Sequence, residues 1–87
     1  MKMVMDCGES RHVRIRIVNI KDEPFRILSA EYEFLKDNEA IFQGKPEIID
    51  HVLDVLLTPP EKGEYTLKYT YTIGDETLID KIGIQVI

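Results

Sequence analysis

The chain has 87 residues, of which 44% are hydrophobic and 31% are charged, and its net charge at pH 7 is −5. This length and composition predict one globular domain spanning residues 1–87 and exclude a disordered chain. The acidic balance argues against nucleic acid as a partner, because proteins that bind phosphates across a surface usually carry a basic face.

Residues 1–20 predict the first two strands, and the N-terminal segment also bears on the cellular compartment of the protein. The opening segment MKMVMDCGESR has none of the features of a secretory signal or a transit peptide, and no segment approaches the roughly 20 apolar residues of a membrane span. These features predict a cytoplasmic protein that does not bind membranes. In RHVRIRIVNI, residues 11–20, apolar and polar residues alternate with the period of a half-buried strand. The face expected to be wet carries His12, Arg14 and Arg16.

Residues 25–36 predict a third strand between the breaker sequence KDEP and the turn signal Asp37-Asn38. The side chains expected to face the core are Leu28, Ala30, Tyr32 and Phe34. In the opposite phase, Ile27 and Leu35 are expected to form an exposed apolar patch that a partner or a second copy would cover.

Residues 39–57, EAIFQGKPEIIDHVLDVLL, fit two patterns. One face of a short helix would carry Ile49, Val52, Leu53 and Leu56. Alternatively, residues 41–49 and 52–57 fit two strands around the turn Asp50-His51. The hairpin is favoured, because glycine and proline stand just upstream and the neighbouring segments read as strands.

The remaining residues predict a loop and a final hairpin. Residues 58–63, TPPEKG, are stiffened by prolines and end on a glycine that can adopt a positive φ. Residues 64–73 then alternate more regularly than any other segment, Gly74-Asp75 is a turn signal, and residues 77–87 pair back. About seven strands at spacings of roughly 8 to 12 residues predict an all-β sandwich.

The segment EKGEYTL, residues 61–67, resembles the D-x-G-x-Y-x-C run that opens strand F of immunoglobulin domains. Gly63 and Tyr65 match, Glu61 stands for the acidic residue and Leu67 replaces the cysteine. The resemblance implies an immunoglobulin-like antiparallel β-sandwich without the inter-sheet disulfide. It also implies that Gly63 and Tyr65 form a structural corner, in which the tyrosine hydroxyl bonds to nearby backbone.

A stand-alone acidic domain with this strand and the hairpin sequence IGDET is similar to small immunoglobulin-like proteins of phage and prophage particles. The resemblance implies a virion location and a non-catalytic structural or interaction role in head decoration, tail or baseplate. The alternative is a small intracellular bacterial binding protein with a peptide or soft-metal ligand. The first interpretation expects a protein partner or self-association and no cofactor.

The basic stripe of His12, Arg14 and Arg16 has two interpretations. It is a candidate face for an acidic protein partner, together with Glu31 and Glu33. Alternatively, the two glutamates alternate with the same period on the next strand in sequence, so the five residues are expected to form a cross-strand charge ladder. The ladder is favoured, because the acidic complement is present.

Two chemical sites are considered and not favoured. Met1, Met3, Met5, Cys7 and His12 form a sulfur-rich opening that offers soft ligands for Cu(I), but alternating methionines are more often packing residues. Cys7 as a nucleophile would need a base, and His12 and His51 are more simply solvated. The sequence therefore predicts no metal site and no enzyme.

Overall fold

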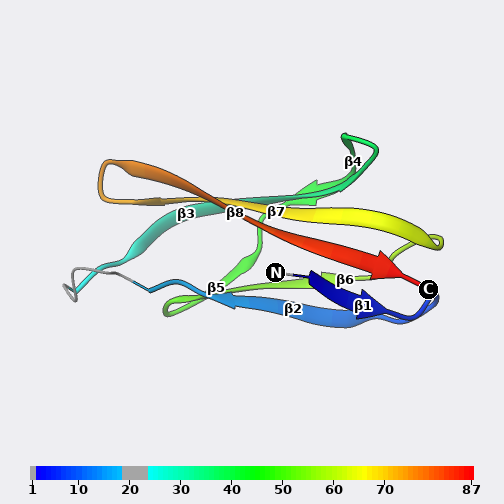
Figure 1. Cartoon of the computed structure of the whole chain (residues 1–87). Coiled ribbons are helices and arrows are strands. Elements are labelled where there is room, and N and C mark those ends of the chain that lie inside the picture. Colours follow the sequence, from blue (N-terminus) through cyan, green and yellow to red (C-terminus); the bar gives the residue numbers. More distant parts are fainter. Residues whose placement is uncertain (1, 19–23) are drawn as a thin grey trace.

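The computed structural model describes residues 2–18 and 24–87, so Met1, residues 19 and 20 of the predicted second strand and most of the predicted turn at 21–24 lie outside it. The strands are the only regular secondary structure of the described residues, and turns and loops connect them (Figure 1). Their bounds are β1 Lys2–Met5, β2 Arg11–Arg16, β3 Ile27–Lys36, β4 Glu39–Gly44, β5 Glu47–Ile49, β6 Val52–Leu57, β7 Gly63–Ile73 and β8 Glu76–Val86. No helix that could cross a membrane occurs in this part of the chain.

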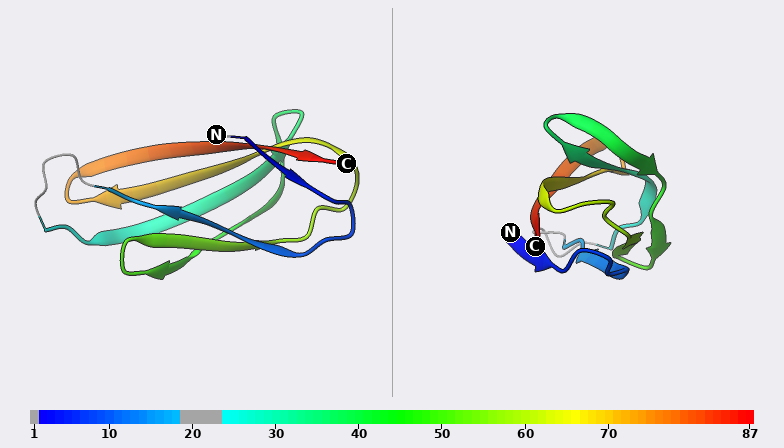
Figure 2. Two further views of the ribbon diagram at one scale, coloured as in Figure 1. Left: turned by 60° about the horizontal axis from the view of Figure 1, so that its bottom comes forward. Right: turned by 90° about the vertical axis from the view of Figure 1, so that its right-hand side faces the viewer.

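The strands form two sheets that pack face to face (Figures 1 and 2). The larger sheet has the order β1-β8-β7-β3-β4, and the smaller sheet has the order β2-β6-β5. All neighbours are antiparallel except β1, which runs parallel to β8. The predicted all-β sandwich is confirmed, with eight strands in the described part of the chain in place of about seven. The extra strand arises because residues 41–49, expected as one strand, contribute to β4 of one sheet and β5 of the other.

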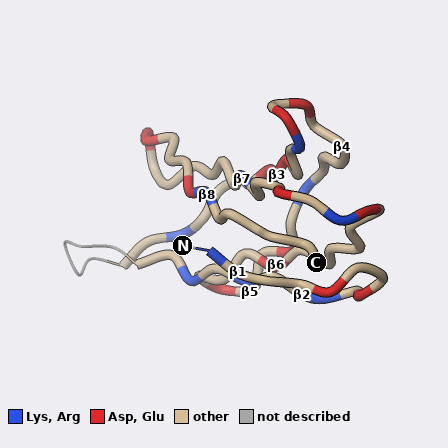
Figure 3. The backbone as a smooth tube through the Cα atoms, turned by 45° about the vertical axis from the view of Figure 1, so that its right-hand side comes forward, with Lys and Arg blue, Asp and Glu red and all other residues tan. Residues whose placement is uncertain are grey.

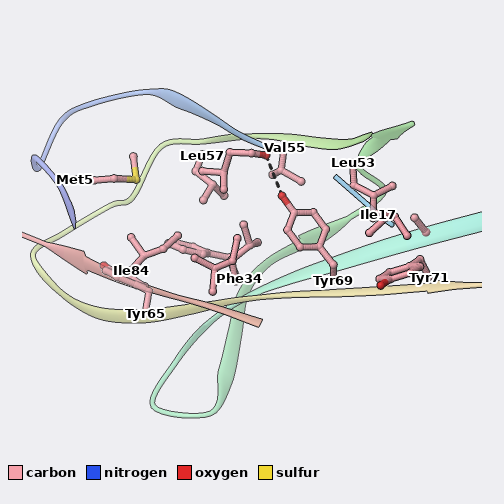
Figure 4. Close-up of a cluster of buried hydrophobic side chains, with 14 of the residues drawn as sticks. Met5, Ile17, Phe34, Leu53, Val55, Leu57, Tyr65, Tyr69, Tyr71 and Ile84 are labelled. Atoms are coloured by element: carbon pink, nitrogen blue, oxygen red, sulfur yellow. Dashed lines mark hydrogen bonds between the residues drawn. The ribbon is translucent and has the colours of Figure 1, made fainter. Parts of the chain in front are cut away.

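The core lies between the sheets and is built from alternate residues of each strand (Figure 4). Phe34, Leu53 and Leu67 are fully buried, and so is the ring of Tyr69. The Tyr69 hydroxyl crosses the core and donates to the backbone oxygen of Val13 at 2.9 Å. Burial of these side chains supplies the main stabilisation of a chain this small, at about 1.5 to 3 kcal/mol for each large apolar group.

A β-bulge in β3 changes the expected face of its first residues. Ile27 lies opposite Ile73 and Ser29 opposite Thr72, so Leu28 is the extra residue. Ile27 is consequently buried, whereas Leu28 is 60% exposed. The sequence prediction that placed Leu28 inside and Ile27 outside is therefore wrong. The extra residue of the bulge moves the residues before it to the opposite face of the sheet. The predicted patch of Ile27 and Leu35 does not form.

The β5–β6 hairpin settles the ambiguous segment in favour of strands. Its two-residue turn is formed by Asp50 and His51, and Asp50 has a φ of +54°. The His51 ring stacks on Phe25 with centroids 3.9 Å apart, and its Nε2 lies 3.0 Å from the backbone oxygen of Phe25. His51 thus fastens the turn to the segment before β3 and is not merely solvated.

The β7–β8 hairpin forms the long middle of the larger sheet (Figure 1). Gly74 takes a φ of +60° in its turn, as a tight hairpin requires. Near this end the inward phase of β8 carries Asp80, which accepts a hydrogen bond from the Tyr71 hydroxyl at 2.8 Å. The tyrosines of β7 therefore belong to the sandwich interior.

Candidate interaction surface

The strand pairing separates the residues that were expected to form one charge ladder. His12, Arg14 and Arg16 lie on β2, which pairs with β6 in the smaller sheet. Glu31 and Glu33 lie on β3, whose neighbours in the larger sheet are β4 and β7. The two sets therefore occupy different layers (Figure 3), and the predicted ladder is wrong. Alternation sets the faces of a strand but does not choose its neighbour.

Two residues of the basic stripe instead contact an aspartate of β6. Asp54 lies directly opposite Arg14, and its Oδ2 is 3.3 Å from the Arg14 Nε. Its Oδ1 is 3.1 Å from the Nδ1 of His12, which lies two residues before Arg14 on the same face of β2. These neighbours cover Asp54 so that it is only 6% exposed, although it faces outward from the sheet. A buried carboxylate needs such partners to offset its lost hydration.

Asp54 was missed by sequence reasoning, although a signal was present. In VLDVLL, residues 52–57, the aspartate stands in the phase opposite to the buried Leu53 and Val55. Trying the register of this strand against RHVRIR would have placed a carboxylate across from an arginine. The sequence did not show which strands were neighbours, so the pairing could not be selected.

Arg16 differs from the other two members of the stripe. It lies opposite Val52, and in the described residues no carboxylate is within ion-pair distance of its guanidinium. In the larger sheet, Glu33 is 3.8 Å from Lys68 and Glu31 lies opposite Thr70. The stripe is therefore partly neutralised at Asp54 and open toward Arg16.

The predicted corner residues Gly63 and Tyr65 lie at the start of β7. The Tyr65 hydroxyl donates to the backbone oxygen of Glu61 at 2.6 Å, and Gly63 has a φ of +146°. Lys36 Nζ lies 2.5 Å from Glu61 Oε1 and 5.5 Å from the centre of the Tyr65 ring. This hydrogen bond raises the pKa of Lys36 and lowers the pKa of Glu61. The corner ties β3, the loop and β7 together and has a structural role.

The described residues of the sulfur-rich opening do not form a common site. Met5 is buried in the core and Met3 packs partly against it, whereas Cys7 is exposed. Met1 lies outside the described residues. No group of three His, Cys, Asp or Glu side chains in the described ranges is arranged to hold a metal. The methionines that can be placed therefore act as packing residues.

Two hollows on the surface contain no nucleophile beside a base. The larger, about 390 Å³, lies beside the corner and is lined by Lys2, Leu35, Asp37, Asn38, Glu64, Tyr65, Thr66, Lys81 and Gly83. The smaller, about 210 Å³, lies between Phe42 of β4 and Leu56 of β6. Neither of these two hollows contains His12, His51 or Cys7, so neither gathers the candidate functional residues of the sequence.

Comparison with known proteins supports the fold and goes no further. No protein-family model and no curated protein matches the chain. A crystal structure of an engineered protein is similar over 98% of this chain, with a TM-score of 0.79 and 14% sequence identity. The chain spans 18% of the length of that protein. At this identity the likeness concerns the fold alone.

Proposed function

We propose that the chain is a non-catalytic structural or interaction module that works through surface contacts. The observation that carries this proposal is the open edge of β2, which bears the basic stripe while the space between the sheets is filled by side chains. An exposed edge can bind another chain through its backbone, whereas catalysis would need a cleft with convergent reactive groups.

We further propose that the module is an immunoglobulin-like component of a phage or prophage particle. The Tyr65 corner and the two-sheet arrangement support the immunoglobulin-like interpretation. The particle is suggested by the resemblance of the GEYTL strand and the IGDET hairpin to proteins of that kind. In such a particle the chain would serve in head decoration, tail or baseplate.

Mass spectrometry of purified particles tests this proposal. Particles from an induced culture of the source strain would be banded on a density gradient and washed at high salt. We expect the chain at a constant ratio to the major structural proteins. Its absence from the particles, with the whole amount in the soluble cell fraction, would contradict the virion role and favour the small cellular binding protein.

A further inference from the structure

We propose that the free edge of β2 binds an extended acidic segment of another protein, which adds a fourth strand to the smaller sheet. This inference rests on the proposed interaction function and specifies one surface and one class of partner. Three features carry it: the outward backbone groups of β2, the exposed Arg16, which has no carboxylate partner among residues 2–18 and 24–87, and the half-buried side chains beneath the edge.

The backbone of β2 has a paired side and an open side. The amide of Ile17 donates to the backbone oxygen of His51 at 2.7 Å, so Ile17 faces β6. In an antiparallel ladder, alternate residues direct both backbone groups to the same side. Ile15 and Val13 therefore face β6, whereas Arg14 and Arg16 direct their N–H and C=O groups away from the sheet. Of the described strands, none pairs with β2 on that side.

The outer side chains favour acidic residues in the bound segment. Arg14 and His12 share the carboxylate of Asp54, while Arg16 has only Val52 across the ladder. An added strand would place a side chain of its own beside Arg16, about 4.5 to 5.5 Å away between Cβ atoms. A glutamate or aspartate there supplies the missing charge, whereas another arginine would repel.

The inner face of the β2 edge favours apolar residues between the acidic residues of the bound segment. Ile15 of β2 and Met3 of β1 are half-buried and pack against the core at the side where β1 and β2 form the sheet edges (Figure 2). Inward side chains of an added strand would cover this apolar rim. The recognised segment therefore alternates acidic and β-branched residues.

A nucleic acid or a second copy fits this edge less well. A phosphate backbone has no amide ladder to match the outward backbone groups of β2. A second β2 would bring arginines against arginines, and β5, the other edge of the same sheet, has only three residues. A separate acidic chain is the occupant that these features favour.

Titration of the ¹⁵N-labelled full chain with a synthetic peptide, acetyl-TVEVEVT-amide, tests the inference. The control EEVVVTT has the same composition without alternation. We expect saturable shifts centred on the amides of Arg14 and Arg16. Peptides N-methylated at one alternate set of residues should bind at least about tenfold more weakly, and those methylated at the other set should still bind, because only one set faces β2.

Reversing the charge of Arg16 provides a second test of the inference. Arg16→Glu should weaken the peptide at least about tenfold, whereas Lys62→Glu, the same change in charge on the exposed loop before β7, should not. Arg16→Gln should give an intermediate loss of peptide affinity. As a control, an unfolding midpoint shared with the parent chain would show that all variants fold.

Three outcomes would overturn the inference: no shifts at about millimolar peptide, binding that tolerates both methylation patterns, or stronger shifts at Arg16 from oligothymidine than from the peptide. The particle experiment remains independent of these results. If the chain copurifies with particles but the peptide fails, the interaction function stands and this edge is not its site.

Discussion

Tyr69 and Tyr65 show how single hydroxyl groups add specific hydrogen bonds to a fold held together mainly by its core. Tyr69 belongs to the larger sheet and donates to Val13 of the smaller one, whereas Tyr65 holds the loop at Glu61. The sequence predicted the second bond through the resemblance of EKGEYTL. It could not predict the first, because the two strands are brought together only by the tertiary packing.

Tyr69→Phe should lower the free energy of unfolding by about 1 to 3 kcal/mol. The substitution leaves the Val13 oxygen without its inter-sheet donor in a site from which water is excluded. Urea unfolding monitored by circular dichroism measures the change. Tyr71→Phe is the matched control and should cost less, because Asp80, the acceptor for Tyr71, is exposed. Equal costs would contradict the role given to the inter-sheet bond.

Tyr65→Phe should cost about 1 kcal/mol, because it removes one part-buried hydrogen bond to backbone and keeps the ring packing. The same unfolding measurement checks it. A variant as stable as the parent would show that Gly63 and the packed ring, and not the hydroxyl, maintain the corner.

At the scale of elements, alternation predicted where most strands lie but not how they pair. It identified the buried faces of β2 and β7, and the polar pair Asp50-His51 marked the β5–β6 turn. The bulge at Leu28 was not predictable, since one extra residue leaves no mark on composition yet reverses the face of its neighbours. The sequence also did not show which strand pairs with β2, so the contact between Asp54 and the basic stripe was not predicted.

Asp50 gives a test of the β5–β6 turn. Its φ of +54° suits aspartate, asparagine and glycine, whereas a β-branched residue is strained there. Asp50→Asn should be nearly neutral, and Asp50→Val should lower the free energy of unfolding by about 1 to 2 kcal/mol. Thermal unfolding of the two variants separates these results. Equal stability would mean that the turn takes another conformation.

At the scale of the whole molecule, burial of tyrosines predicts loss of stability in alkali. Burial raises the pKa of Tyr71 to about 12, with the hydrogen bond to Asp80 adding to the shift, and burial also raises the pKa of Tyr69. The unfolded chain releases these protons near pH 10, so above that pH it binds fewer protons than the native state. The free energy of unfolding should therefore be insensitive to these two groups below about pH 10 and fall above it.

Urea unfolding at about pH 8, 10 and 11 measures this fall. Tyr71→Phe is the control and should show a shallower decline between about pH 10 and 11, because it removes one of the two titrating groups. A decline unchanged by the substitution would assign the alkaline sensitivity to other residues.

The proposed interaction function depends on an unpaired edge of β2, and hydrogen exchange tests this most directly. In the free protein, the amides of Val13 and Ile15 should be protected by β6, whereas those of Arg14 and Arg16 should exchange at least about tenfold faster. Exchange of the ¹⁵N-labelled chain followed by NMR gives each rate separately. Equal and strong protection of all four amides would contradict the account, because it would mean that the edge is already covered.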